Sequence, residues 1–319
     1  MLSCAILDDY QQTTLTRVDV SHLRDQVRFD VYDTHLDDTD ALIERLKGYD
    51  IILAMRERTP FDRERLSRLP QLKLLITTGL KNASIDLQAA KDHSILVCGT
   101  PGFPGSTAEL TWGLLLSIMR HLPQEMDGFK SGHPQWQQTV GRDLQGLTLG
   151  VLGLGTLGGR VARYGRAFDM EVLGHSRSFT PEKAAEMGIT FVEDLAAMSA
   201  RADIISIHMP LNAQTRGMIG ADELARMKKG VILLNTSRGP IVDEEDLIAA
   251  LQSGQVGAAG LDVFDVEPLP LDHPFRRMAN VHATPHLGYV THNSYRAFFN
   301  GMVEVIDGFL AGKPVRALT

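Results

Sequence analysis

The sequence is poor in two residue classes, and each shortage excludes a class of protein. Cysteine occurs only at Cys4 and Cys98, which is too few for a disulfide framework or a cysteine-rich zinc cluster and typical of a reducing compartment. Positive charge is in deficit, with 32 Lys and Arg against 39 Asp and Glu and a formal net charge of −7. We therefore expect no broad nucleic-acid surface, although a local basic pocket would still accept a small anion.

Long apolar runs are missing as well. No run approaches the roughly 18 residues that a membrane span needs. The N-terminal "MLSCAILDDY" (residues 1–10) lacks the basic start of a signal peptide and soon reaches two acids. We expect a cytoplasmic protein that does not contact membranes.

The composition and pattern are those of an α/β protein. Apolar residues make up 44% of the 319 residues, and this length is sufficient for two domains. Strands are expected over residues 4–9, 27–32, 50–55, 73–78, 95–98, 147–153, 170–176, 202–209, 230–236 and 258–264. Helices are expected over residues 40–48, 62–69, 107–122, 160–168, 244–254 and 291–312. Two successive alternating series predict two doubly wound parallel-sheet domains.

A segment rich in glycine and proline, "GTPGFPGSTAEL" (residues 99–110), separates the two series and is the expected domain hinge. Ser106 and Glu109 have the spacing of a capping box that starts the next helix. That helix, residues 107–122, is apolar nearly all round, so it is buried either inside its own domain or against a partner subunit. Both interpretations stay open at this point.

A glycine-rich segment follows directly after an expected strand. In "TLGVLGLGTLGGRVA" (residues 148–162), Gly153, Gly155 and Gly158 have the G-x-G-x-x-G spacing of a dinucleotide-binding turn. These glycines allow a tight turn, approach of a pyrophosphate and close helix–strand packing. Free N–H groups near Thr156 and Leu157 would face the phosphates. The alternative is a tight strand–helix turn that binds nothing.

The second strand of this unit ends without the usual acid. An Asp or Glu there would bind both ribose hydroxyls and repel a 2′-phosphate, but this chain has Ser176 and Arg177. A guanidinium is suited to phosphate oxygens, so we expect NADP(H) to be favoured and NAD(H) to remain possible. The alternative is that Arg177 only points into solvent.

Three later segments each follow a strand and carry residues suited to hydride chemistry on a 2-oxo acid. Arg238 in residues 235–244 would bind the substrate carboxylate and polarise the carbonyl. His286 in "TPHLG" would give a proton to the carbonyl oxygen, and Glu267 would orient its imidazole and favour the protonated form. The alternatives are a surface arginine and a turn glutamate.

Metal binding is not expected. His282 and His286 are four residues apart, but Pro285 between them disfavours the helix that a metal pair would need. The acids at residues 243–246 fit the dipole at the start of a helix better than a metal site.

The order of the motifs, G-x-G-x-x-G, "NTSRG", "FDVEP" and "TPHLG", resembles that of the D-isomer-specific 2-hydroxyacid dehydrogenases over nearly the whole chain. The resemblance implies a Rossmann cofactor domain (residues 99–288) inserted into a flavodoxin-like substrate domain (residues 1–98 plus 289–319). It implies that Arg238 binds substrate, Glu267 assists and His286 is the acid/base. It also implies a homodimer through the helix at 107–122.

The resemblance extends to binding residues. The cofactor set that we expect is Gly153, Gly155, Thr156, Leu157, Gly158, Ser176, Arg177, His208, Pro210, Thr215, Thr236, Asp262 and Gly288. Within it, Asp262 matches the residue that contacts the nicotinamide amide, and residues 208–216 match the loop beside the adenosine. The expected substrate set is Arg56, Thr78, Gly79 and Leu80.

The resemblance implies an NAD(P)H-dependent D-2-hydroxyacid dehydrogenase. Glyoxylate and hydroxypyruvate are candidate substrates, but Leu80 or Lys81 and Tyr289 depart from the small residues usual there and leave the substrate open. We expect no C-terminal regulatory domain. The alternative function is a nucleotide-sensing binding protein or co-repressor on the same fold. A formate dehydrogenase would have Gln at the position of Glu267.

Overall fold

The chain forms two compact units, each described here by itself. The computed structural model describes residues 1–103, 105–177 and 179–319; Pro104, inside the expected hinge, and Ser178 lie outside the described residues. Unit 1 comprises Met1–Phe103 and Thr291–Thr319, and unit 2 comprises Pro104–Val290. Unit 2 is thus inserted into unit 1 along the sequence. The chain passes from unit 1 to unit 2 after Phe103 and returns after Val290, whereas the expected boundaries follow residues 98 and 288.

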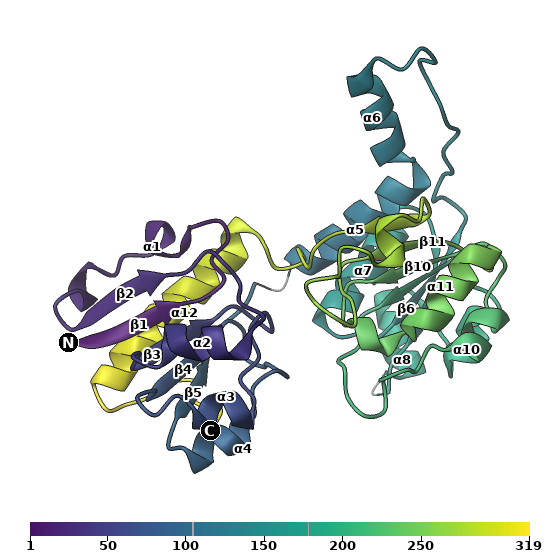
Figure 1. Cartoon of the computed structure of the whole chain (residues 1–319). Coiled ribbons are helices and arrows are strands. Elements are labelled where there is room, and N and C mark those ends of the chain that lie inside the picture. The colour runs from purple at the N-terminus through teal and green to yellow at the C-terminus, as the bar shows by residue number, and fades with distance from the viewer. Residues whose placement is uncertain (104, 178) are drawn as a thin grey trace. The chain divides into compact units, whose positions relative to one another are not determined.

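Unit 1 is a parallel sheet with helices between its strands (Figure 1). Its strands are β1 (Leu2–Ile6), β2 (Val27–Val31), β3 (Ile51–Ala54), β4 (Leu74–Thr77) and β5 (Leu96–Gly99). Its helices are α1 (Thr14–Arg17), α2 (Thr39–Leu46), α3 (Arg63–Ser67), α4 (Leu87–Asp92) and α12 (His292–Leu310), with a short 3-10 turn at Ser21–Leu23. The strand order β2-β1-β3-β4-β5 is the flavodoxin-like order that the resemblance implies.

The C-terminal helix α12 completes unit 1. It packs against β4 and β5 through a face whose buried side chains include Phe298, Phe299 and Met302. Thr291 caps its start by accepting a hydrogen bond from the amide of Ser294, 3.3 Å away. The helix expected over residues 291–312 is therefore present, over His292–Leu310.

Unit 2 is a larger parallel sheet covered on both faces. Its strands are β6 (Thr148–Leu152), β7 (Glu171–His175), β8 (Thr190–Phe191), β9 (Ile204–Ile207), β10 (Val231–Asn235), β11 (Val256–Leu261) and β12 (Val281–Ala283). Its helices are α5 (Ser106–Met119), α6 (Leu122–Ser131), α7 (Thr156–Ala167), α8 (Pro181–Met187), α9 (Leu195–Ser199), α10 (Ala221–Arg226) and α11 (Glu244–Ser253), with 3-10 turns at Gly239–Ile241 and Pro274–Arg276. The order β12-β11-β10-β9-β6-β7-β8 contains the Rossmann arrangement, which confirms the predicted fold class.

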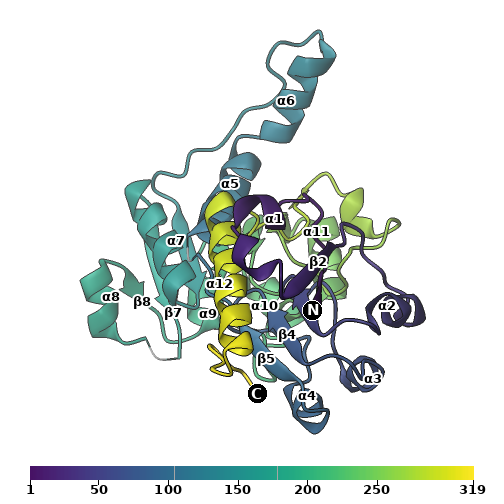
Figure 2. The same cartoon turned by 90° about the vertical axis from the view of Figure 1, so that its left-hand side faces the viewer.

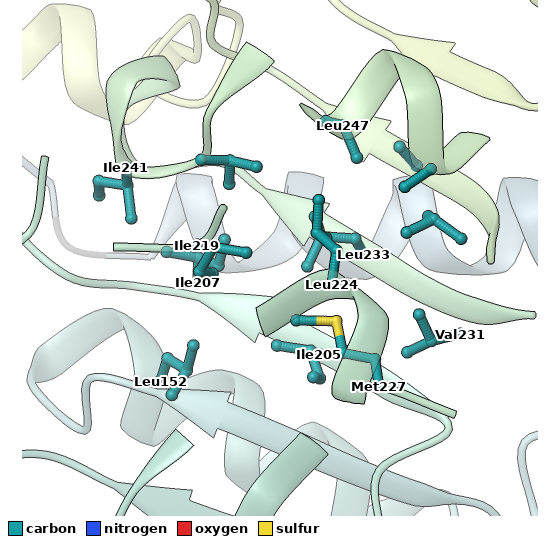
Figure 3. Close-up of a cluster of buried hydrophobic side chains, with 14 of the residues drawn as sticks. Leu152, Ile205, Ile207, Ile219, Leu224, Met227, Val231, Leu233, Ile241 and Leu247 are labelled. Atoms are coloured by element: carbon teal, nitrogen blue, oxygen red, sulfur yellow. The ribbon is translucent and has the colours of Figure 1, made fainter. Parts of the chain in front are cut away.

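Two apolar cores occupy the two faces of the unit 2 sheet. Along β10, Leu233 belongs to one core, whereas Ile232 and Leu234 belong to the other, because successive side chains of a strand point to opposite faces. Figure 3 shows the first core, in which Leu224 and Met227 from the segment of α10 cover the sheet. Strands buried on both faces explain why the expected strands are continuous apolar runs.

Several helices begin at an aspartate, although we expect this from the sequence only at residues 243–246. In each, the carboxylate accepts a hydrogen bond from a backbone N–H in the first turn, which satisfies one of the free donors there. These caps are Asp38 of α2, Asp62 of α3, Asp86 of α4, Asp194 of α9 and Asp243 of α11. The acids at residues 243–246 thus start a helix, as predicted.

The expected helix over residues 107–122 differs from the observed one in three respects. It begins at Ser106 with Gly105 as N-cap, so the predicted capping box of Ser106 and Glu109 is wrong. It stops at Met119, and a left-handed residue, His121, precedes a second helix, α6, that the sequence pattern does not reveal. Both views show α6 extending away from the rest of unit 2 (Figure 1 and Figure 2).

Helix α5 is buried mostly in its own unit. Trp112 packs its ring against Tyr164 and Phe168, with centroids 5.8 and 5.0 Å away, and Leu115 is fully buried. Its all-round apolarity is therefore largely explained by the core of unit 2. Exposed apolar side chains gather instead on α6 and the segment after it; they are Leu122, Met126, Phe129, Trp136 and Val140.

Candidate active site

The register of unit 2 brings three predicted site segments to one edge of the sheet. Asn235 at the end of β10 pairs with Leu261 of β11, and Leu261 pairs with Ala283 of β12. The segments that follow these residues therefore leave the carboxyl ends of adjacent strands, where open α/β sheets bind ligands. Sequence reasoning locates these segments after strands, although β12 itself is not among the expected strands.

Glu267 and His286 are in direct contact. The Nδ1 atom of His286 lies 2.5 Å from Oε2 of Glu267, and Oε1 of Glu267 accepts a hydrogen bond from the amide of Phe264 at 2.9 Å. An ionised carboxylate only accepts, so the Nδ1–H donates and Nε2 is left for another partner. The ring of Tyr289 meets the imidazole edge-on, with centroids 5.4 Å apart. The imidazole is thus oriented on two sides and one-fifth exposed.

Asp262 lies beneath the loop that carries His286. Its Oδ1 accepts hydrogen bonds from the hydroxyl of Thr284 and the amide of Leu287, both at 2.6 Å. Its Oδ2 accepts from the amide of Gly288 at 2.8 Å. Burial raises the pKa of the Asp262 carboxyl, and these hydrogen bonds to the ionised form oppose that rise.

Arg238 stands on the neighbouring segment. Its Nη1 donates to the carbonyl of Ser237 at 2.6 Å, and its own carbonyl accepts from the side chain of Asn235 at 2.9 Å. The next residue, Gly239, allows close approach of the segment that leads to Glu267, because a Cβ there would lie 2.1 Å from the backbone carbon of Phe264. The segments of Arg238 and Glu267 therefore touch.

The glycine-rich turn has the geometry that a dinucleotide requires. Gly153 has φ +88°, and a Cβ on it would lie 2.6 Å from the carbonyl oxygen of His208. A Cβ on Gly158 would lie 1.8 Å from the carbonyl oxygen of Gly153. Gly155, the N-cap of α7, has open space where its side chain would be. Helix α7 starts at Thr156, so the free N–H groups there, Leu157 included, fit a pyrophosphate.

Ser176 and Arg177 follow β7 with no acid beside them. Arg177 is exposed, and its Nη1 donates to the side-chain oxygen of Gln214 at 2.7 Å. Gln214 belongs to the loop at residues 208–216 that the resemblance implies for the adenosine. The guanidinium is therefore held near that loop rather than pointing only into solvent.

Hydrogen bonds within the loop after β9 and to its neighbours hold it in place. The hydroxyl of Thr215 donates to the carbonyl of Pro210 at 2.7 Å. The Nε2 of His208 is 2.8 Å from the hydroxyl of Ser206, and burial lowers the pKa of His208 from 6.5 to about 4. Thr236, on the adjacent segment, shares a 2.7 Å hydrogen bond with Thr111 of α5.

The expected substrate residues gather within unit 1. Arg56 donates from its amide to the hydroxyl of Thr78 at 2.8 Å and from Nη1 to the carbonyl of Thr78 at 3.0 Å. Gly79 has φ +96°, which a residue with a side chain rarely adopts, and a Cβ there would also displace Nη1 of Arg56, 1.8 Å away. Leu80 is 53% exposed.

The structure adds residues that sequence reasoning missed. Asn82 donates to the carbonyl of Arg56 at 2.6 Å, and Thr107 of α5 donates to the carbonyl of Gly288 at 3.0 Å. Thr284 and Gln214 have the contacts already given. Asn82 and Thr284 lie inside motifs that the sequence marks, but their partners are distant in sequence, and no local pattern indicates them.

No metal or membrane feature is found in the parts of the chain that the structure describes. Residues 1–103, 105–177 and 179–319 contain no group of three or more His, Cys, Asp or Glu arranged to hold a metal. His282, on β12, lies 3.3 Å from the hydroxyl of Ser117. Among the described helices, none is both long and apolar enough to cross a membrane.

Comparisons with known proteins agree with this geometry. The family model described as "D-isomer specific 2-hydroxyacid dehydrogenase, NAD binding domain" matches residues 112–288, which is more than half of the chain. A glyoxylate reductase of Aeropyrum pernix is 39% identical over 79% of this chain and 77% of its own length. The crystal structure of a phosphoglycerate oxidoreductase from Vibrio cholerae has a TM-score of 0.92 at 36% identity and covers 98% of this chain and 100% of its own.

A longer relative matches as well. The D-3-phosphoglycerate dehydrogenase of Methanocaldococcus jannaschii is 37% identical over 86% of this chain, but the match covers 52% of that protein. This chain therefore spans about half the length of the curated phosphoglycerate dehydrogenases that it matches.

Proposed function

The chain belongs to the D-isomer-specific 2-hydroxyacid dehydrogenase family, and we propose that it is an NAD(P)H-dependent oxidoreductase that interconverts a small 2-oxo acid and its D-2-hydroxy acid. The observation that carries the proposal is the 2.5 Å contact between Glu267 and His286 at the strand edge of a dinucleotide-binding fold. A nucleotide sensor would need no such oriented proton donor, so that alternative is not favoured.

The chain's own residues bind and move a proton in this reaction. The nicotinamide, when bound, supplies or accepts the hydride. His286 gives a proton from Nε2 to the carbonyl oxygen in reduction and takes it back in oxidation, because Nδ1 is engaged with Glu267. Arg238 binds the substrate carboxylate and polarises the carbonyl beside it. Asp262, which is buried, would contact the nicotinamide amide, as the family resemblance implies.

The turn at residues 153–158 would hold the pyrophosphate. The residues after β7 would discriminate between NAD(H) and NADP(H). We propose that NADP(H) is preferred and that NAD(H) is also accepted. Ser176 brings no negative charge to the site of a 2′-phosphate, and Arg177 is held near the 208–216 loop by Gln214. His208, Pro210, Thr215, Thr236 and Gly288 belong to the same proposed cofactor set.

Unit 1 supplies the substrate contacts in this proposal. Arg56, Thr78 and Gly79 form one hydrogen-bonded and packed group, and together with the exposed Leu80 they would meet the acid. Glyoxylate and hydroxypyruvate are the proposed substrates, supported by the match to a glyoxylate reductase.

We further propose a homodimer in a reducing, cytoplasmic compartment. The region predicted for the contact, residues 107–122, leads into α6, whose Met126 and Phe129 are 55% and 72% exposed. Exposed apolar side chains on a projecting helix are suited to burial against a second copy. Cys4 and Cys98 are both free and buried, in keeping with a reducing compartment.

The decisive experiment follows the absorbance of NADPH and NADH with glyoxylate and with hydroxypyruvate. We expect turnover with both acids and a higher kcat/KM with NADPH. Firm nucleotide binding without turnover on any small 2-oxo acid would overturn the proposal and favour a sensor.

A further inference from the structure

The backbone of His286 is in an unusual conformation. Its φ is +53°, in the left-handed region that a residue with a side chain rarely adopts. Such a conformation persists only where the surrounding structure holds it. The question is which groups hold this loop.

The carboxylate of Asp262 holds this loop. Its carboxylate accepts from residues on both sides of His286, namely the hydroxyl of Thr284 before it and the amides of Leu287 and Gly288 after it, at 2.6 to 2.8 Å. Asp262 is 1% exposed, so water does not compete for these hydrogen bonds.

A second group supports the same loop from α5. The hydroxyl of Thr107 donates to the carbonyl of Gly288 at 3.0 Å, so both backbone groups of Gly288 are held. A Cβ on Gly288 would lie 3.0 Å from both Oδ2 of Asp262 and the hydroxyl of Thr107, so the position has little room for a side chain.

We propose that Asp262 is a positioning residue for His286: its carboxylate fixes the loop at residues 284–288 and thereby sets where the imidazole meets Glu267. The inference rests on the proposed function, in which His286 moves the proton. It goes beyond the nicotinamide contact implied by the family resemblance, because three of the roughly four acceptor positions of a carboxylate are already engaged within the loop.

The test uses Asp262→Asn and a matched pair at Thr284. In Asp262→Asn an amide N–H₂ replaces one acceptor, so a loop donor loses its partner. We expect kcat for glyoxylate to fall about 100-fold, because misplacement by about 1 Å costs that much. We expect the Kd for NADPH, read from nucleotide fluorescence, to rise by about tenfold at most, much less than the fall in kcat, because the variant removes at most one contact to the nicotinamide and leaves the phosphate turn untouched.

The Thr284 pair isolates one hydrogen bond without altering the carboxylate. Thr284→Val removes the hydroxyl and should lower kcat about fivefold, whereas Thr284→Ser keeps it and should retain the wild-type kcat. If Asp262→Asn does not fold, this pair decides the matter. A loss in Thr284→Ser equal to that in Thr284→Val would overturn the proposal.

Failure of the inference is distinguishable from failure of the proposed function. If His286→Ala abolishes turnover but Asp262→Asn keeps kcat and only weakens NADPH binding, the carboxylate is a cofactor contact alone and the inference is wrong. If His286→Ala retains full turnover, the proposed role of the imidazole is wrong, and with it the inference.

Discussion

The two units present their key side chains with the same backbone conformation but stabilise it with opposite chemistry. Arg56 in unit 1 and His286 in unit 2 both have φ +53°. In unit 1 the group to be satisfied is the carbonyl of Arg56, and the amide N–H₂ of Asn82 donates to it at 2.6 Å. In unit 2 most of the groups held beside His286 are donors, and the carboxylate of Asp262 accepts from the amides of Leu287 and Gly288. The polarity of the free backbone group thus determines which side chain can hold the loop.

The largest effect should come from removing the imidazole that unit 2 presents. His286→Ala should lower kcat by roughly 10²–10⁴-fold, the usual share of a positioned proton donor, with unchanged Kd for NADPH. His282→Ala is the matched control, because His282 lies on β12 and contacts Ser117 instead. Equal losses in the two variants, measured by steady-state kinetics, would contradict the assignment.

Replacing the donor that holds Arg56 in unit 1 by an acceptor should weaken substrate binding. Asn82→Asp places an acceptor against the carbonyl of Arg56, so Arg56 loses its backbone support. We expect KM for glyoxylate to rise about 30-fold with little change in nucleotide affinity. Asn280→Asp serves as the control, because Asn280 also donates to a carbonyl, that of Leu251, but lies in unit 2. An unchanged KM in Asn82→Asp would contradict a role of Arg56 in substrate binding.

A variant of the proposed 2′-phosphate contact in unit 2 should change nucleotide affinity. Arg177→Ala should weaken NADPH about tenfold and NADH much less, because only NADPH carries the 2′-phosphate that a guanidinium binds. Arg166→Ala removes a guanidinium that donates to the carbonyl of Met187 and should leave both affinities unchanged. Equal weakening of the two nucleotides by Arg177→Ala, measured by fluorescence titration, would contradict 2′-phosphate recognition.

The smallest expected effect is on the free energy of unfolding. One histidine in each unit makes it depend on pH, and the two dependences have opposite sign. The hydrogen bond from His35 to Asp8 in unit 1 raises the pKa of that histidine, whereas burial lowers the pKa of His208 in unit 2 to about 4. His35 therefore contributes stability below its unfolded pKa of about 6.5, and the contribution is lost as pH rises through its folded pKa. His208 lowers stability as pH falls from about 6.5 towards 4, since the unfolded chain then binds a proton that the folded chain does not.

Urea unfolding at pH 5 and pH 8 measures this difference. His35→Gln should destabilise more at pH 5 than at pH 8. His208→Gln should destabilise less at pH 5 than at pH 8, by about 2 kcal/mol, because the variant no longer carries the proton-linked loss. The same pH trend in both variants would show that the two histidines do not differ as described.

Much of the fold follows from local patterns, and much of the site does not. Apolar runs predict the buried strands. The glycine spacing predicts the turn, because a Cβ on Gly153 or Gly158 would meet a nearby backbone oxygen and Gly155 leaves open space beside the turn. Helix α6 escapes prediction because its apolar side chains are exposed and show no buried stripe. The hydrogen bonds of Asp262 to the loop of His286 could not be predicted either, since its partners lie 22 to 26 residues away in sequence. The contact of Glu267 with His286 is expected from the placement of their segments after strands and from the motif order, not from the spacing of the two residues.

The stereochemistry of oxidation is the most direct test of the proposed chemistry. The rate of NADP⁺ reduction is measured with D-glycerate and with L-glycerate at equal concentration, and His286→Ala provides the blank. We expect turnover with the D-isomer alone, and none above the blank with the L-isomer. Equal rates with both isomers, or a rate in His286→Ala equal to that of the wild type, would contradict a D-specific hydride transfer that depends on the imidazole held by Glu267.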